Sequence, residues 1–175
     1  GCDSMGTLSS SSEGTNFMMV NGNAAGSTAT ANNHYKFIGW FTDAAHTNPV
    51  TASWVDANNK LTPQKVGGVN VSDEFFAYFE PAEYTIKFQV GDQGTWADGT
   101  PASSTKDVTL TYNTVYGSHI PTYSGTGAAI KANTGYGFKQ WAEVDAATGA
   151  VIRTLTDSAL RAERADADRV FKAIW

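Results

Sequence analysis

The chain has 175 residues, of which 41% are hydrophobic and 17% are charged, and its formal net charge is −5. Charged residues make up about 25% of an average globular protein, so this chain is poor in charge. It is rich instead in small polar residues, including 17 glycines, which is typical of turn-rich β-structure in secreted proteins. The acidic balance argues against nucleic-acid binding, and no run of 18 apolar residues is present that could insert into a membrane.

The chain contains one cysteine, Cys2, which cannot form an internal disulfide. Apolar cores alone must therefore hold the fold together. A terminal residue is rarely ordered, and Cys2 would be lipidated only if a signal peptide preceded it. We expect Cys2 to be an incidental terminal residue.

The first half of the sequence predicts four short strands and almost no helix. They lie near Gly6–Leu8, near residues 26–31, over the Y-x-F-x-x-W phrase at 35–40, and over FFAYF at 75–79. The residues between the last two strands are polar and rich in turn formers. Within them, residues 62–65 could form one helical turn at most.

A proline-containing segment, residues 80–83, connects the two halves. Pro81 has no N–H and biases the residue before it toward an extended conformation, so it should not extend a β-ladder. We predict one module over residues 1–80, a short linker over 81–83 and a second module over 84–175.

The second half predicts a similar series of strands. Residues 84–90 alternate between apolar and polar, which is the period of a half-buried strand. Further strands are expected at 108–112, over the aromatic phrase at 136–141 and at 171–175. One helix is expected over Asp157–Arg164, with Asp157 as its N-cap.

Three phrases occur twice, and their order along the chain is the same in both halves. A-N-x-x-Y-x-F-x-x-W at 31–40 returns 101 residues later, and FFAYF at 75–79 returns as FKAIW 96 residues later. Gly-Thr at 6–7 returns at 94–95. Because the spacings differ while the phrases persist, we interpret the chain as two tandem copies whose loops have changed length.

The repeated aromatic residues could form either a core or a ligand platform. On a regular strand Tyr35 and Phe37 share one face, and Trp40 joins them only if a bulge intervenes, which Gly39 permits. A module of about half this chain has a total stability of about 4–13 kcal/mol. Truncating one buried Trp costs about 3–5 kcal/mol, so we interpret these residues as core.

Two other tryptophans, Trp54 and Trp96, lie outside the repeated phrases in turn-rich segments. They are the candidates for exposed ligand contacts, although folding back over a small core is the commoner fate of such residues.

Catalytic and metal-binding patterns are weak. The histidines His34, His46 and His119 lack zinc-site spacing, and no G-x-S-x-G phrase occurs. Asp92 and Asp98 lie in a glycine-rich loop that lacks the ligand spacing of an EF-hand, and we interpret it as a tight turn at Asp98-Gly99 instead of a metal site.

Other charged residues suggest no reactive site either. Lys87 lies on a polar strand face, which argues against an intramolecular isopeptide bond. We interpret the arginines and acids of residues 153–169 as a solvated mixed-charge surface. We therefore predict no catalytic, cofactor-binding or metal-binding residue and no cofactor.

The ordered phrases Y-x-F-x-x-W and F-x-A-x-(F/W) resemble the Listeria–Bacteroides repeat, also called the internalin B-repeat. YKFIGWFTDAAHTNPV at 35–50 is similar to that family throughout, whereas the second copy has Gln140 in place of Gly and lacks the T-D-x-A stretch. The resemblance implies mostly β, β-grasp-like modules with little helix. Such modules occur in series in large bacterial surface proteins, and the family has no catalytic residues to carry over.

These observations predict a non-catalytic stalk or spacer in a secreted protein anchored to the bacterial cell wall, with neighbouring repeats as its immediate partners. One alternative is an adhesive module that contacts a host protein or glycan through Trp54 or Trp96. Another is an accessory domain of a secreted polysaccharide-active enzyme.

Overall fold

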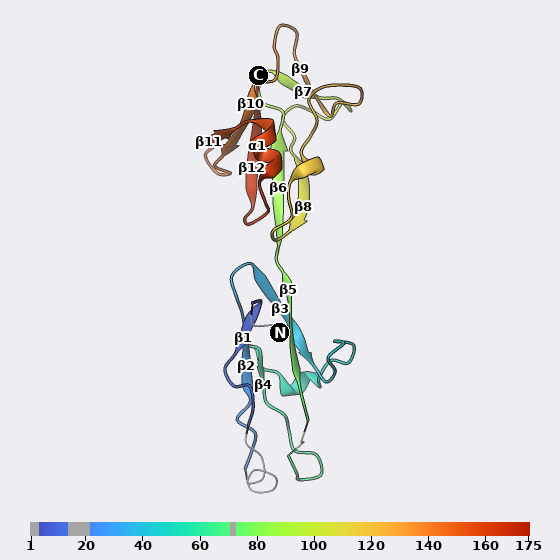
Figure 1. The fold of residues 1–175 in the computed structure, drawn as a ribbon, viewed down its shortest axis with the longest axis vertical. Coiled ribbons are helices and arrows are strands. Elements are labelled where there is room, and N and C mark those ends of the chain that lie inside the picture. The colour runs from blue at the N-terminus through green and yellow to red at the C-terminus, as the bar shows by residue number, and fades with distance from the viewer. Residues whose placement is uncertain (1–3, 14–21, 71–72) are drawn as a thin grey trace. The chain divides into compact units, whose positions relative to one another are not determined.

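The computed structural model of the chain describes residues 4–13, 22–70 and 73–175, so the expectation for Cys2 lies outside the described residues. The chain divides into two compact units, Gly1–Ala82 and Glu83–Trp175, here called unit 1 and unit 2. Both are mostly β, as the sequence predicts (Figure 1).

Unit 1 contains two small antiparallel sheets. In the first, β1 (Gly6–Leu8), β2 (Ser27–Ala31) and β4 (Lys60–Leu61) pair in the order β1-β2-β4. In the second, β3 (Tyr35–Phe41) pairs with β5 (Phe76–Pro81). A short 3₁₀ helix, η1, spans Ala52–Trp54, and residues 62–65 form no helical turn.

The bulge that Gly39 permits in the aromatic strand is present. The β3–β5 register shifts between Phe37 and Gly39, which brings Phe37 and Trp40 onto one side of the strand. Their ring centroids are 6.1 Å apart, and Phe37 also packs at 5.5 Å against Phe79 of β5. Trp40 and Phe79 are buried in the unit 1 core, together with Ala29, Val50 and Leu61.

The predicted linker at 81–83 is not a separate segment. Pro81 is the last residue of β5, and β6 begins at Glu83, so Ala82 alone lies between the strands. The N–H of Ala82 donates to the carbonyl of His34, which makes Tyr35 and Pro81 a non-hydrogen-bonded pair. The nitrogen of Pro81 therefore points away from β3, and the ladder loses no bond there.

Unit 2 is built on a five-stranded sheet with the order β11-β10-β12-β6-β8. Its central neighbours β6 (Glu83–Gln89) and β12 (Arg169–Ile174) are parallel, and the other pairs are antiparallel. The outer strands are β8 (Lys106–Thr111), β10 (Gln140–Val144) and β11 (Val151–Leu155). Separately, β7 (Gly94–Trp96) pairs with β9 (Ile130–Ala132), and η2 spans Gly117–His119.

The expected helix is present as α1 (Asp157–Ala162), which contacts β10 and β11 (Figure 1). Its N-cap is Thr156 rather than the predicted Asp157, because the Thr156 hydroxyl accepts the N–H of Ala159 at 3.2 Å. Leu160 is the one helix residue that reaches the buried core, which it shares with residues from all parts of unit 2.

The second aromatic phrase is only partly in a strand. β10 begins at Gln140, so Phe138 precedes it, and Tyr136 is 50% exposed, which contradicts its assignment to the core. Phe138 still packs at 5.5 Å against the buried Trp141 and at 5.7 Å against Trp175. The strand expected at 108–112 is present as part of β8, which pairs with β6.

Candidate functional site

The two candidate contact residues, Trp54 and Trp96, lie in different units and are not brought together. Trp96 is 3% exposed, and its indole N–H donates to the carbonyl of Ser104 at 3.1 Å. Trp96 is therefore not an exposed contact residue but folds into the core, because its pairing with Ile130 in the short β7–β9 ladder holds it there. Trp54 is half-buried and packs at 6.2 Å against Phe75, so part of its surface remains accessible.

The acidic residues of the loop at 91–100 have protein partners. Asp92 forms an ion pair with Lys172, with 2.9 Å between Oδ1 and Nζ. Asp98 accepts hydrogen bonds from Lys106 and from the Thr100 N–H, and these hold its pKa well below the ordinary value. Across residues 4–13, 22–70 and 73–175, no three His, Cys, Asp or Glu side chains group as metal ligands.

A pair of aspartate-capped turns follows the two aromatic phrases. Asp43 accepts the N–H and hydroxyl of Thr47, and Asp145 accepts the N–H and hydroxyl of Thr148, with both hydroxyl contacts at 2.7 Å. These bonds, chiefly those from the threonine side chains, lower both pKa values. An aspartate-capped turn therefore follows each aromatic phrase, although the T-D-x-A stretch itself is absent around Asp145.

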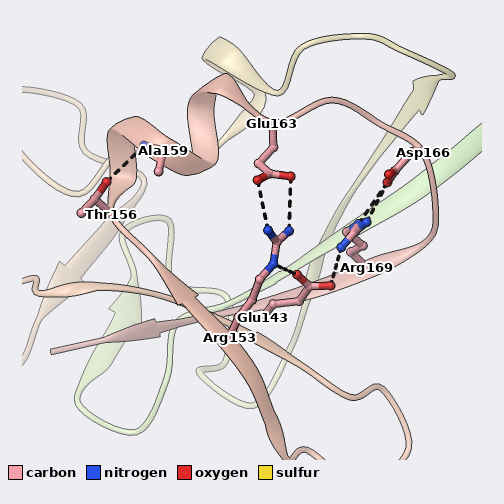
Figure 2. Close-up of polar contacts among 7 residues, drawn as sticks. All are labelled: Glu143, Arg153, Thr156, Ala159, Glu163, Asp166 and Arg169. Carbon is pink, nitrogen blue, oxygen red and sulfur yellow. Dashed lines mark hydrogen bonds and ion pairs between the residues drawn. The ribbon is translucent and has the colours of Figure 1, made fainter.

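The charged residues at 153–169 are not a simple solvated surface, because two of them enclose the buried Glu143. Glu143 is 6% exposed and lies on the same strand face as Trp141. Arg153 pairs with it across the β10–β11 ladder and donates from Nε at 2.6 Å, while Arg169 of β12 donates from Nη1 at 2.7 Å (Figure 2).

The network continues beyond Glu143 in both directions. Arg153 uses its two Nη atoms to bind both carboxylate oxygens of Glu163, the C-cap of α1, at 3.1 and 3.2 Å. Arg169 also binds Asp166 at 2.8 Å (Figure 2). The hydrogen bonds to Glu163 and Glu143 raise the pKa of Arg153, so its charge is secured.

This network connects β10, β11 and β12 to the C-terminal end of α1, so we assign it a structural role. Each Glu143 oxygen already accepts a guanidinium N–H. Nearby, Tyr116 is 1% exposed, and burial raises its pKa to about 12. The sequence signal for the cluster was a lone acid between apolar residues on a strand face that also carries Trp141.

A groove of about 900 Å³ lies over the opposite face of the five-stranded sheet. Lys87 and Val170 are paired in the β6–β12 register and share this face, whereas Phe88 and Phe171 face the core. The cationic groups in the groove have acidic partners, since Lys87 lies 3.5 Å from Asp107 and Lys172 is paired as described above. A charged ligand here would have to displace these pairs.

No family model, curated protein or solved structure matches the chain. Within the part of the chain that the structure describes, no helix is long and apolar enough to cross a membrane.

Proposed function

We propose that the chain is a non-catalytic spacer segment of a secreted bacterial surface protein, built from two tandem β-grasp-like modules. The observation that carries this proposal is an aromatic cluster that recurs around a buried Trp in both units. Phe37, Trp40 and Phe79 form it in unit 1, and Phe138, Trp141 and Trp175 form it in unit 2. The residues that recur in the two aromatic phrases thus pack against each other, and this argues against a ligand platform repeated in both units.

Backbone pairing supports the tandem interpretation. Gly6 pairs with Ala31 in unit 1, as Gly94 pairs with Ala132 in unit 2. A Cβ on Gly6 would lie 2.4 Å from the Phe79 ring, and a Cβ on Gly94 would lie 2.5 Å from Trp175. Both pairs therefore require glycine beneath the closing aromatic side chain.

The β-grasp-like assignment is supported by the sheet of unit 2. Its first and last strands, β6 and β12, lie side by side and parallel in the middle of the sheet, with antiparallel neighbours outside them. A small module of this kind can be repeated to add length without enlarging any core. Length between an anchor and a binding region is what a stalk provides.

Surface display tests the spacer function. One, two or three copies of the chain would be placed between a cell-wall anchor and an epitope, and binding of a bulky antibody would be measured. We expect binding to rise with copy number, because each copy adds reach. A Trp40→Ala/Trp141→Ala copy, which removes both central aromatic side chains, is the control and should add less. Binding that does not depend on copy number would contradict the proposal.

The groove in unit 2 favours one alternative function, which is ligand binding. The ligand would be a host protein or glycan, or the polysaccharide substrate of an enzyme to which the chain belongs. Trp96 cannot supply the contact, and Trp54 is in the other unit. Glycan and host-protein arrays would separate the functions, with Lys87→Glu as the groove variant and Lys36→Glu as a matched change in unit 1. Binding lost only in Lys87→Glu would favour the adhesive module.

A further inference from the structure

The two strands that connect unit 2 to the rest of the polypeptide are direct neighbours. β6 is the first strand of the unit and β12 is the last, and they pair in parallel from Ile86 opposite Arg169 to Gln89 opposite Lys172 (Figure 1). The two ends of unit 2 are therefore attached to neighbouring strands, so tension along the chain acts directly on this pairing.

Force applied through the chain ends would pull β6 from its first residue and β12 from its last. Because the strands are parallel, these pulls act in opposite directions along one shared axis. The ladder is then loaded in shear, and its evenly spaced hydrogen bonds must fail together. In an antiparallel pair pulled from two adjacent ends, the bonds instead break one after another.

Three side-chain contacts also connect the segments that contain β6 and β12. The Thr85 N–H donates to Asp168 Oδ1 at 2.7 Å, just before the ladder begins. Beyond its other end, the Trp175 indole N–H donates to the Val90 carbonyl at 2.6 Å. The Asp92–Lys172 ion pair joins the same two segments. The shear path therefore extends beyond the four ladder pairs at both ends.

Unit 1 has the opposite geometry among its described residues. Gly6, in its first strand, pairs with Ala31, and Pro81, in its last strand, pairs with Tyr35. Ala31 and Tyr35 flank a single tight turn, closed by the Tyr35 N–H and the Asn32 carbonyl. Pulling on the two ends of unit 1 thus peels β1 from β2 and β5 from β3, starting at this turn.

We propose that the β6–β12 pair is a mechanical clamp that lets unit 2 keep its fold under tension, while unit 1 yields at lower force. This rests on the proposed spacer function, because a stalk between a cell and an attached surface transmits force. Unit 1 then lengthens the chain when pulled, and unit 2 preserves its structure.

Single-molecule force spectroscopy tests the clamp on the whole chain in a Cys2→Ser background. One molecule carries handles at residue 1 and residue 175. A second carries them at residue 175 and at Lys139→Cys, beside the Gln140–Ile174 pair, so that β10 and β12 are pulled from adjacent ends. Both molecules contain the same unit 2 fold, so only the direction of force differs. Trp40→Ala identifies the unit 1 event by lowering its force alone.

We expect unit 2 to need at least about twice the force in the end-to-end direction, because forced unfolding follows the unfolding rate and shear loads every ladder bond at once. We also expect unit 1 to unfold first. Equal forces in the two directions, or a unit 2 that unfolds before unit 1, would overturn the clamp. Either result leaves the copy-number dependence in surface display unchanged, so failure of the clamp and failure of the spacer function are distinguishable.

Discussion

Truncation of Trp141 is the most direct test of the idea that the repeated aromatic residues are core. Its side chain is fully buried and packs edge to face against Phe88 at 5.6 Å and Phe138 at 5.5 Å. Its indole N–H donates to Asp157 Oδ1 at 3.1 Å. Trp141→Ala would therefore remove a large apolar volume and one hydrogen bond from the middle of unit 2.

The size of the effect follows from this packing. Replacing a buried Trp by Ala costs about 3–5 kcal/mol, the sum of lost transfer energy and the remaining cavity. Asp157 keeps its bond to Arg161, so the lost indole donor adds little. We expect a loss of about 4 kcal/mol from a unit of roughly 90 residues, whose total stability is about 5–14 kcal/mol.

Urea denaturation, followed by NMR signals that belong to unit 2 alone, would measure this loss from the midpoint and the slope m. Tyr136→Ala is the matched control, because Tyr136 belongs to the same phrase but is half exposed. It should cost less than about 1 kcal/mol. A Trp141→Ala loss below about 1 kcal/mol, or equal losses in the two variants, would refute the core assignment.

Three further predictions concern the charge network, a glycine and a capped turn. Glu143→Gln should lower the free energy of unfolding by about 2 kcal/mol. This is less than the cost of breaking a fully buried ion pair, because the side chain of Arg153 is 39% exposed. Urea denaturation measures this loss, and an unchanged free energy of unfolding would contradict the buried network. Gly94→Ala should cost about 1–3 kcal/mol because its Cβ would meet Trp175, whereas Gly137→Ala, with open space around it, should be close to neutral in the same assay. The lowered folded-state pKa of Asp145 stabilises the fold above the ordinary pKa of 3.8, and this contribution is lost as the pH falls through the folded-state pKa. The stability difference between the native chain and Asp145→Asn should therefore shrink below about pH 4, and a difference that stays constant from neutral to acidic pH would contradict this.

Local patterns predicted the regular parts of the fold. The alternation in residues 84–90 corresponds to β6, and the glycine before Trp40 marks a real bulge. Both signals depend only on residues that are close together in the chain, so they can be read from the sequence. The burial of Trp40 and Trp141 followed from size and energy, since a small unit cannot leave its largest apolar side chains in water.

Pairing between distant segments could not be predicted in the same way. Trp96 lies in a turn-rich stretch, and it is buried because β9, more than thirty residues later, pairs with it. Glu143 finds one partner ten residues away and another twenty-six residues away. Tyr136 matches Tyr35 in sequence, yet it is exposed because the second strand begins only at Gln140.

The adjacency of β6 and β12 also governs how unit 2 is made. Thr85 and Asp168 are joined by a hydrogen bond but lie 83 residues apart in the chain. Ile86 and Phe88 emerge from the ribosome early, and the strand that completes their sheet is synthesised last. Contacts so distant in sequence form slowly. Unit 2 therefore exposes an unfinished apolar surface until its final strand has been synthesised, and surface of that kind is prone to aggregation.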